Sequence, residues 1–478
     1  MSPLARAALG AALVASTPGC GSESTPDEPA SGGTGGAPET GLTSPKEAQD
    51  LDPDPDVVHV QLRAAHYDHV MDGMLHHGYA YDEQIPGPTL RAKVGDELVV
   101  DFQNGLEAET TIHWHGLRAP YEMDGVTWQH DPIAPGTTFT YHFKLDRAGT
   151  FWYHPHFDSA AQVDAGLYGF LVVESPDDPK ADRELLVALD VMDEPTGDGG
   201  MGHNHNRSAD GGMDMDGGHM GGHPAPGAVA WMANSQHDAT AELRGGESVR
   251  VRLLNASNES YLDLSGAWLR QIGSDQGLLP ALAQPERLLL APGDRAELEW
   301  LVGSAGFDLT TAPYSLAGGA ALGDPAPLFH VAVKDGAAAP PPLAWPFDGA
   351  APTPDPGTTD VLYTLTGDAH HGDWRINGEQ FPDVTIEELA LDQDAVIELR
   401  NVSATEHPFH LHGNFFEVLA TNGEPPAARS IEDTVNLAVR DVVRLRLVAD
   451  NPGDWMAHCH ILPHADQGML TLLRVNAQ

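Results

Sequence analysis

Residues 95–104 read GDELVVDFQN: a polar turn, then alternating apolar and polar side chains, and a terminal Asn. This period of two is typical of a β-strand with one buried face. The same pattern recurs at residues 246–255 and 392–401. A second strand-like run follows each copy some forty to fifty residues later, at residues 138–145, 295–301 and 442–448. Three copies at this strand density, with Gly/Pro turns, predict three all-β domains, each a sandwich or a barrel.

Four short histidine motifs stand apart from this repeat. They read His113-Trp114-His115, His154-Pro155-His156, His407-Pro408-Phe409-His410-Leu411-His412 and His458-Cys459-His460. His464 and Met469 stand five and ten residues after Cys459. Two His, one Cys and a weak axial Met are the ligands of a blue-copper site. The last motif therefore predicts such a site around Cys459.

The histidines that flank Cys459 predict a second metal cluster. Neighbouring side chains on a strand point to opposite faces, so if Cys459 binds one copper, His458 and His460 must bind others. One His completes the blue site and eight remain for the cluster. We expect alternation along the strand to send the two imidazoles of each His-x-His pair to different metals. Zinc is the alternative metal, but zinc sites prefer four local ligands and would leave Met469 unexplained.

With these motifs the chain resembles the bacterial three-domain multicopper oxidases, of the laccase and cuprous-oxidase kind. The resemblance covers residues 51–478 and includes the phrases GPTL at 87–90, RLLNA at 252–256 and ING at 376–378. It implies three cupredoxin-like Greek-key barrels and four copper ions. It also implies an enzyme that passes electrons from a small reductant, which would be a phenol, an aromatic amine or Cu(I), to O2.

The resemblance assigns the ligands residue by residue. The type 1 copper would be bound by His407, Cys459, His464 and Met469, and the type 2 copper by His113 and His410. The two type 3 coppers would be bound by His115, His154 and His460, and by His156, His412 and His458. No ligand of the family pattern is missing.

Proton delivery is the second role that the resemblance implies. Asp124 stands eleven positions after His113, where the family places an acid near the cluster. A turn Asp before Gly is the alternative reading of Asp124. Many bacterial relatives carry Glu on each side of the last type 1 His, but here Pro463 and Ala465 take those places. Asp466 is a weaker candidate for proton delivery.

The repeat and the resemblance together divide the chain. We expect a signal peptide at residues 1–20, a disordered tether at 21–50, cupredoxin domains at 51–176, 184–335 and 358–478, and a Pro/Ala-rich linker at 336–357. The copper motifs fall only in the first and third domains. These two domains should therefore meet at the multicopper cluster, with the second domain as a spacer.

The first twenty residues predict export. An Ala/Leu-rich stretch at residues 7–15 follows Arg6 and is too short to span a bilayer, as in a secretory signal. Gly before Cys20 resembles a bacterial lipoprotein cleavage site, although Thr17 and Pro18 depart from the usual pattern. We expect a periplasmic or cell-envelope protein with a lipid anchor at Cys20; a plain signal peptide is the alternative. With Cys459 on copper, no disulfide is expected.

Residues 192–232 form an unusual Gly- and Asp-rich segment inside the second domain. Its thioether and imidazole side chains suit Cu(I): Met201, His203, His205, Met213, Met215, His219, Met220 and His223. We expect an insertion that collects labile copper, and a disordered Gly-rich insertion is the alternative.

Composition narrows the partners. The 478 residues carry 70 Asp and Glu against 25 Lys and Arg, a formal charge of −45. This balance argues against nucleic acid and favours cationic substrates, including metal ions. We expect a monomer. A copper-sequestering protein with secondary oxidase activity is the competing function, whereas a copper nitrite reductase would need two domains and no cluster of eight His.

Overall fold

The computed structural model describes residues 41–71, 74–191, 230–321, 323–347, 349–367 and 372–477. The predicted signal peptide with Cys20, and the predicted copper-collecting side chains between Met201 and His223, lie outside these ranges. None of the helices in the described ranges has the length and apolar character that a membrane crossing requires.

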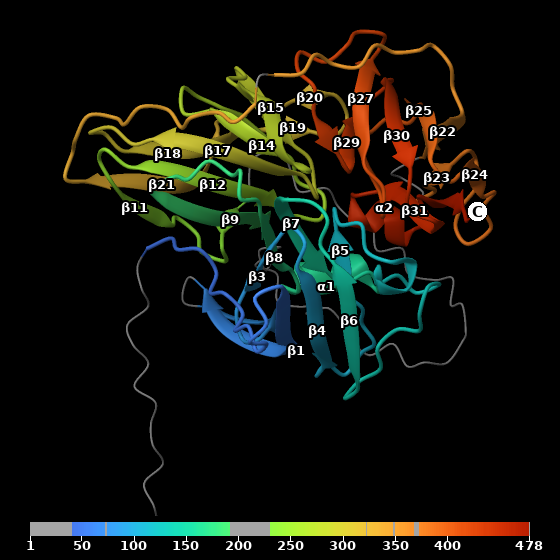
Figure 1. Ribbon diagram of the computed structural model, residues 1–478, viewed down its shortest axis with the longest axis horizontal. Coiled ribbons are helices and arrows are strands. Elements are labelled where there is room, and N and C mark those ends of the chain that lie inside the picture. Colours follow the sequence, from blue (N-terminus) through green and yellow to red (C-terminus); the bar gives the residue numbers. More distant parts are fainter. Residues whose placement is uncertain are drawn as a thin grey trace, which may run out of the picture. The chain divides into compact units, whose positions relative to one another are not determined.

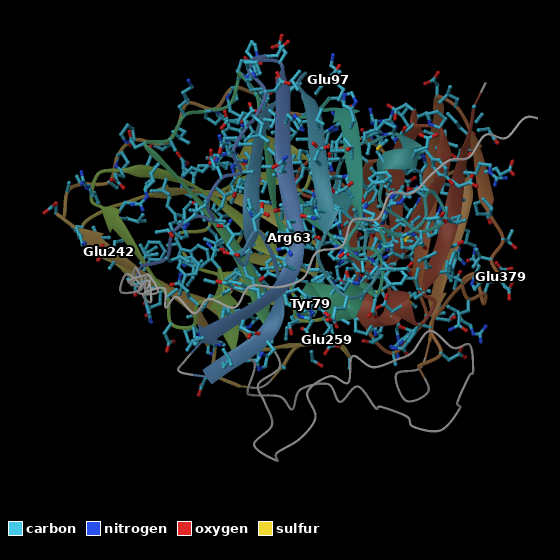
Figure 2. The ribbon with its side chains drawn as sticks, turned by 90° about the horizontal axis from the view of Figure 1, so that it is seen from below. Arg63, Tyr79, Glu97, Glu242, Glu259 and Glu379 are labelled. Carbon is cyan, nitrogen blue, oxygen red and sulfur yellow. The ribbon has the colours of Figure 1, made fainter. Side chains whose placement is uncertain are left out.

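The first pair of β-sheets lies between residues 57 and 174 (Figure 1). One sheet, in the order β2-β1-β4-β6, consists of β1 Val57–Met71, β2 Met74–Tyr81, β4 Glu97–Asn104 and β6 Thr138–Lys144. Figure 2 labels Arg63 of β1, Tyr79 of β2 and Glu97 of β4 on this sheet. The other sheet, β3-β8-β7-β5, consists of β3 Gly87–Lys93, β5 His113–His115, β7 Gly149–His154 and β8 Gly169–Glu174. The 3-10 turn η1 Tyr121–Met123 and the helix α1 Ser159–Asp164 lie in its connections.

The second pair of sheets lies between residues 183 and 334. The sheet β10-β9-β12-β17-β14-β15 consists of β9 Arg183–Val191, β10 Trp231–Ala233, β12 Ser248–Asn255, β14 Gln271–Ser274, β15 Gly277–Ala283 and β17 Arg295–Leu301. The sheet β11-β21-β18-β13-β16 consists of β11 Thr240–Arg244, β13 Leu262–Ser265, β16 Arg287–Leu290, β18 Phe307–Ala312 and β21 Ala326–Lys334. A small ribbon pairs β19 Tyr314–Ser315 with β20 Gly319–Ala320.

The third pair of sheets lies between residues 361 and 476. The sheet β23-β22-β25-β30-β27-β28 consists of β22 Val361–Thr366, β23 Arg375–Ile376, β25 Gln393–Asn401, β27 Phe416–Thr421, β28 Ile431–Glu432 and β30 Val442–Ala449. The sheet β24-β32-β31-β26-β29 consists of β24 Glu387–Ala390, β26 His407–Leu411, β29 Thr434–Leu437, β31 Gly453–Cys459 and β32 Leu470–Asn476. The helix α2 Leu462–Asp466 joins β31 to β32. The prediction of an all-β chain is confirmed.

The sequence repeat corresponds to one antiparallel strand pair in each of the three parts. These pairs are β4 with β6, β12 with β17, and β25 with β30. All six sheets of these parts lie in one compact unit, Thr40–Gln478; the other unit, Met1–Glu39, lies outside the described ranges. The boundaries between the three cupredoxin domains stay predictions.

The terminal Asn of each repeat ties a strand end to the loop that follows it. The Asn401 amide donates to the carbonyls of Thr405 and Leu437 at 2.7 and 3.0 Å, and its oxygen accepts the Ser403 N–H at 2.9 Å. Asn104 and Asn255 make the corresponding bonds in the other two repeats. All three are buried. A buried amide with its bonds satisfied fixes the path of the loop, and after Asn401 that loop leads directly into β26 and its histidines.

Two predicted boundaries are wrong. Leu42 is 1% exposed in the core of the second pair of sheets, and its N–H donates to the Thr240 carbonyl at 2.7 Å. The tether therefore cannot extend to residue 50, because this apolar side chain is buried. Trp231 and Met232 likewise lie in β10 and are buried, so the Gly-rich insertion ends before residue 231 rather than at 232.

Candidate metal centre

Two strand pairs bring the histidine motifs together. β5 pairs with β7 so that His113 lies opposite His154, and β26 pairs with β31 so that His410 lies opposite His458. The two sheets then meet through stacked imidazoles. The ring centroids of His113 and His412 are 3.9 Å apart, and those of His115 and His410 are 3.8 Å apart. The first and third parts of the chain therefore share one cluster of eight imidazoles, to which His154, His156, His458 and His460 also belong.

The two imidazoles of each His-x-His pair point to the same side, not to opposite sides. Ring centroids are 5.8 Å apart in the 113/115 pair and 5.7 Å apart in the 458/460 pair. Residues two apart on a strand share a face, so alternation cannot be what sends the two imidazoles to different metals; that they bind different metals stays a prediction. The residue between them takes the other face: Trp114 is buried in the core of the first part, and Cys459 lies in the core of the third.

Burial favours the neutral form of seven imidazoles of the cluster. Burial lowers the pKa of these seven, and for all but His410 a neighbouring imidazole is the next cause: His115, His154, His156, His410, His412, His458 and His460. Positive charges this close in a buried space would repel one another. Neutral imidazole is the form that binds a metal.

Hydrogen bonds to carbonyl and carboxylate oxygens show which nitrogen of each ring is bare. The Nδ1 atoms of His113, His154 and His410 donate to the backbone oxygens of Asp124, Pro155 and Asp433 at 2.9 Å. Their Nε2 atoms are buried without a partner. His115 is reversed, since its Nε2 donates to Asp433 at 3.0 Å and its Nδ1 is bare. An acceptor behind each of these four rings fixes its tautomer and turns the lone pair toward the cluster.

His412 and His458 give the strongest sign of a cation. Their Nδ1 atoms donate to Asp124 and to the Cys459 carbonyl at 2.8 Å each, which leaves a lone pair on each Nε2. Those two Nε2 atoms are only 3.1 Å apart, and the Nε2 of His156 lies 3.5 Å from that of His458. Facing lone pairs repel unless a cation lies between them. Two further groups of histidines, 113/115/154 and 113/410/412, have potential ligand atoms within 4.8 Å of one another. An imidazole-rich cluster of this kind fits copper.

Asp124 is part of this centre rather than a surface turn residue. Its side chain is fully buried, and one carboxylate oxygen accepts a hydrogen bond from His412 Nδ1. Its backbone carbonyl accepts a hydrogen bond from His113 Nδ1. The other carboxylate oxygen has no hydrogen-bond partner. Gly125 allows this placement, because it has a φ of +86° and a Cβ there would lie 1.8 Å from the Ile112 carbonyl oxygen. Asp124 thus orients one histidine from each side of the cluster.

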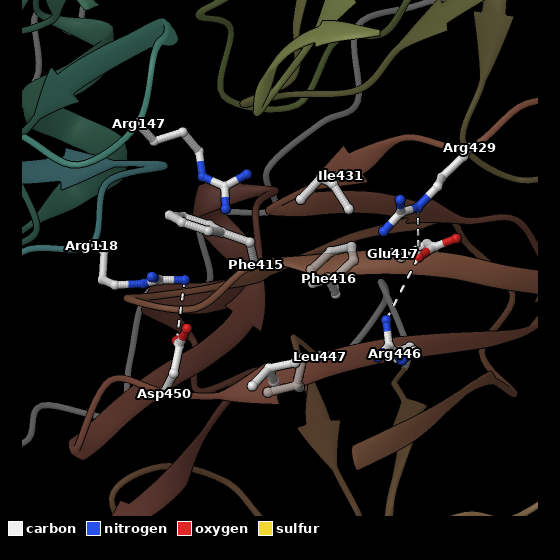
Figure 3. A pocket seen from close by; sticks show the side chains of 11 residues that line it. Arg118, Arg147, Phe415, Phe416, Glu417, Arg429, Ile431, Arg446, Leu447 and Asp450 are labelled. Carbon is white, nitrogen blue, oxygen red and sulfur yellow. Dashed lines mark hydrogen bonds and ion pairs between the residues drawn. The ribbon is translucent and has the colours of Figure 1, made fainter. Parts of the chain in front are cut away.

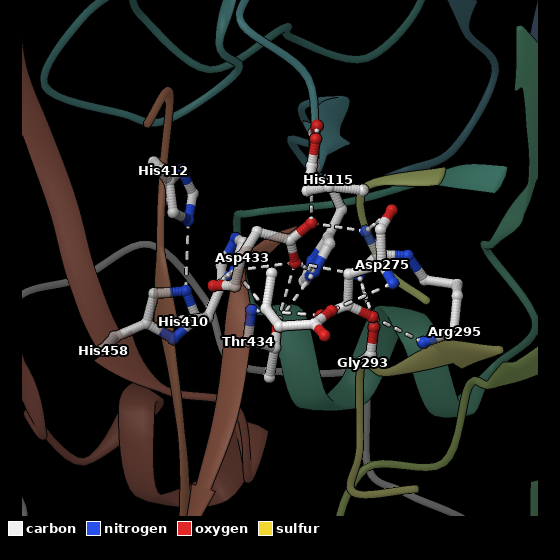
Figure 4. Close-up of polar contacts among 12 residues, drawn as sticks. His115, Asp275, Gly293, Arg295, His410, His412, Asp433, Thr434 and His458 are labelled. Carbon is white, nitrogen blue, oxygen red and sulfur yellow. Dashed lines mark hydrogen bonds and ion pairs between the residues drawn. The ribbon is translucent and has the colours of Figure 1, made fainter. Parts of the chain in front are cut away.

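A buried ion pair from the second and third parts supports the opposite side of the cluster (Figure 4). Arg295 donates two hydrogen bonds to the two oxygens of Asp433, and the Asp433 carboxylate also accepts from His115 and, at 2.6 Å, from Gln276. Arg295 and Asp433 are at most 1% exposed. The planar guanidinium matches the carboxylate fork, so this pair fixes the orientation of His115.

The acids around Arg295 differ in their protonation. Burial alone would raise the pKa of Asp433, but Arg295 and His115 hold it well below its usual range. Burial raises the pKa of Asp275, of Glu432 to about 7 and of Asp294 to about 8. One guanidinium cannot neutralise four buried carboxylates, so the charge concentrates on Asp433 while its neighbours retain protons.

Gly293 lies against the cluster from the second part of the chain. It has a φ of +89°, and a Cβ there would lie 2.9 Å from Cγ of His460. We expect Gly293→Ala to displace the His460 ring and to lower copper content and oxygen uptake, the latter by about ten- to a hundredfold, because small misplacements of reacting groups are that costly. Copper analysis and oxygen uptake would measure this.

Gly136 provides a matched control for that substitution. It follows Pro135 in the corresponding turn of the first repeat and has a φ of +74°, but a Cβ there meets nothing within 4 Å. Gly136→Ala should carry only the backbone strain, about 1–2 kcal/mol, and keep full copper. Equal copper loss in both variants would contradict the proposed contact with His460.

The blue-copper ligands converge next to this cluster. The Sγ of Cys459 lies 3.5 Å from Nδ1 of His407 and 3.6 Å from Nδ1 of His464. Met469 is fully buried, and its carbonyl accepts the Cys459 N–H at 3.1 Å. Burial raises the pKa of the Cys459 thiol and lowers the pKa of His407 to about 3. A soft cation would displace the thiol proton, as binding of thiolate ligands to metals generally does.

Two further side chains shape this site, and sequence reasoning missed both. The hydroxyl of Ser403 lies 2.7 Å from Nε2 of His407, which leaves Nδ1 to face Cys459. The ring of Trp374 lies 3.8 Å from that of His464, and Trp374 is 3% exposed. Neither residue lies in a metal-binding motif. Ser403 stands two residues after Asn401, and a serine has the same spacing from the terminal Asn of the second repeat. This shared spacing was the one sequence signal for Ser403.

Asp433, Arg295, Gln276 and Gly293 were also missed. They lie on strands or turns of the second and third parts, and only packing brings them to the histidines. The second part of the chain is therefore more than a spacer. Asp466, the weaker candidate for proton transfer, accepts a hydrogen bond from the Ala160 N–H at 3.0 Å and so joins α2 to α1. The assignment of each ligand to a particular copper stays a prediction.

Comparison with known proteins agrees with this geometry. Two family profiles, both described as Multicopper oxidase, match residues 64–178 and 354–478. Multicopper oxidase MmcO of Mycobacterium tuberculosis is 30% identical over 428 residues, with 82% of each chain covered. A Copper resistance protein A homolog of Pseudomonas syringae pv. tomato is 26% identical over 523 residues, covering 82% of this chain and 88% of the relative. The multi-copper oxidase structure from Pseudomonas Thermotolerans matches with a TM-score of 0.71 and 29% identity, over 88% of this chain and 99% of that one. The expected cupredoxin-like fold is thereby confirmed.

Proposed function

Because this chain belongs to the multicopper oxidase family, and is thus an oxidoreductase with four copper ions, we propose that it oxidises a phenol, an aromatic amine or cuprous ion and reduces O2 to water. The single observation that carries this proposal is the arrangement around Cys459. Its Sγ faces His407 and His464, while His458 and His460 on either side of it belong to the eight-histidine cluster. One residue thus connects an electron-entry site to an oxygen-reducing site.

The coppers supply one-electron transfer at Cys459 and four-electron reduction of O2 at the histidine cluster. The chain's own residues supply the rest. Imidazoles in a buried pocket exclude bulk water, and backbone acceptors behind His113 and His410 hold those two rings in place. Cys459 is covalently continuous with His458 and His460, so the electron path between the sites is short.

Asp124 is our candidate for proton delivery. It is buried beside two cluster histidines, and one of its oxygens is free of hydrogen bonds. A carboxyl group at this position can accept a proton from solvent and pass it toward the oxygen-binding space. With Pro463 and Ala465 in place of acids beside His464, the chain has no carboxylate at those two positions.

Copper sequestration with secondary oxidase activity is the second candidate function. The relative that is named as a copper resistance protein, the charge of −45, and the Met and His content of residues 201–223 support it. Soft thioether ligands favour Cu(I), and an acidic protein attracts cations.

Oxygen uptake by the copper-loaded enzyme, with Cu(I) and a phenol offered side by side, tests the oxidase proposal. Uptake with at least one donor is expected, and no uptake with any donor would refute it. Deleting residues 200–223 separates the two candidates. Cuprous oxidation that falls while phenol oxidation holds would assign that segment to copper, and no change in either would remove this role.

We also propose export with a lipid anchor at Cys20, which the leader sequence supports. Mass spectrometry of the mature N-terminus would check this. A mature chain that begins with an unmodified residue other than Cys20 would contradict the anchor.

A further inference from the structure

A pocket rich in arginine lies where the first and third parts of the chain meet, and it contains no copper ligand (Figure 3). Arg118 and Arg147 reach it from the loops that follow β5 and β6. Arg429 and Arg446 reach it from the third part. Four of the 25 Lys and Arg residues of a chain with a charge of −45 therefore surround one cavity of about 190 Å³.

Three of the four arginines of the pocket are already paired with carboxylates. Glu417 and Asp450 are the two carboxylates in the lining. Glu417 accepts from Arg429 at 3.0 Å and also from Thr353, and Asp450 pairs with Arg118 at 3.1 Å. Arg118 also pairs with Asp146 at 3.3 Å, and Arg446 pairs with Asp394 at 2.8 Å, so of the four arginines only Arg147 has no carboxylate partner among the described residues.

Arg147 is the cation that stands out. Among the described residues no carboxylate forms an ion pair with it, and its guanidinium lies 4.6 Å from the centre of the Phe415 ring. Arg118 lies 4.9 Å from the same ring, and its Nε is buried without a partner. Burial, and then the charge of Arg118, lower the pKa of Arg147, while the charges of Asp146 and Asp450 act in the opposite direction. A guanidinium remains charged in proteins, so it needs an anion.

The remaining lining is apolar. Phe416 and Leu447 are 1% and 2% exposed, and Ile431 is half-buried beside them. Cavities of about 150 Å³ hold a benzene ring, so this cavity has room for one ring with one small substituent. Apolar walls with a few charged groups are typical of sites for small organic ligands.

We propose that this arginine pocket binds an aromatic carboxylate, with the carboxylate on Arg147 and the ring against Phe416, Ile431 and Leu447. The planar guanidinium fork matches a carboxylate, and the apolar walls favour a ring over an inorganic anion. The bound ligand would join loops of the first part to β27 and β30 of the third. It would therefore stabilise the contact between the two parts that form the copper cluster.

Calorimetric titration of the copper-loaded enzyme with benzoate tests this. Benzoate should bind with one site per chain and raise the unfolding temperature. Benzamide, which has the same shape but no charge, should bind about tenfold more weakly or worse, because a charge-assisted hydrogen bond is lost. Inorganic phosphate, which has no ring, should also bind more weakly. No benzoate binding, or equal binding of benzoate and benzamide, would overturn the site; equal binding of phosphate would overturn its aromatic part.

Two substitutions locate the binding. Arg147→Gln should weaken benzoate about tenfold or more and leave four coppers bound. Arg63→Gln removes the same charge from an exposed side chain of β1 (labelled in Figure 2) that is not part of the pocket lining, and it should leave the affinity unchanged. Wild-type affinity in Arg147→Gln, or an equal loss in Arg63→Gln, would refute the assignment. Because benzoate is not used as an electron donor here, these outcomes are independent of the oxidase proposal.

Discussion

Replacing Cys459 by Ser will remove the blue-copper site and reduce turnover by about three orders of magnitude or more. Cys459 supplies the one thiolate among the ligands, and its Sγ is the atom that faces both His407 and His464. A serine hydroxyl is a hard, protonated ligand and does not replace a thiolate. The main chain still joins His458 to His460, so the eight-histidine cluster should keep its copper. The visible absorption of the blue site, copper per chain and oxygen uptake measure the three effects.

Met469→Leu is the matched control at the same site. It keeps the thiolate and both imidazoles and removes only the weak axial thioether. This variant should remain blue and active with a raised reduction potential. A Cys459→Ser enzyme that retained four coppers and turnover would refute the role assigned to the thiolate, and a colourless Met469→Leu enzyme would show that the site depends on more than its Cys and His ligands.

Replacing Asp433 by Asn will have the second largest effect, on both stability and copper. The Asp433 carboxylate accepts from Arg295, His115 and Gln276, and all of these groups are buried. A neutral amide leaves Arg295 without its closest counter-charge, and its N–H₂ faces donors. Breaking a buried pair in this way costs about 3–5 kcal/mol. We expect a lower free energy of unfolding in urea and loss of copper from the histidine cluster, with the blue absorption retained.

Glu432→Gln is the control for Asp433, because it changes the adjacent buried acid. Burial raises the pKa of Glu432 to about 7, above its ordinary value. A carboxyl whose folded pKa is raised contributes stability at low pH that is lost as pH rises toward the folded pKa. The Gln variant should therefore match the wild type near pH 4 and become relatively more stable as pH rises toward 7. Equal destabilisation in Glu432→Gln and Asp433→Asn at neutral pH would contradict the division of charge proposed for these acids.

The two substitutions also separate two kinds of inference. Cys459, with its neighbours and the His and Met that follow, could be recognised in the sequence, because ligand identity and spacing along one strand are local properties. Asp433 could not, because it stands on the short connection between β28 and β29 and carries no motif. Its partner Arg295 lies 138 positions away in the chain, at the start of β17.

Reliance on local sequence pattern also explains the errors in the sequence-based predictions. The period-two repeat predicted the strands that the structure pairs as β4/β6, β12/β17 and β25/β30. The same local view ended the tether at residue 50, because the surrounding polar residues concealed that Leu42 has a buried place in a distant core. It also gave strand alternation as the reason why the two imidazoles of a pair go to different metals, although residues two apart share one face of a strand.

The sequence by itself determined the metal chemistry of this protein and its all-β class. Both depend on residue type and on spacing within a few positions. Tertiary structure decided the rest: which nitrogen of His115 and of His412 is bare, the Arg295–Asp433 support of the cluster, the contact of Gly293 with His460, and the arginine pocket. Each of these joins residues from different parts of the chain. The positions of two such residues in the sequence do not show whether they are close in space. Their proximity is set by the packing of the sheets around hydrophobic cores.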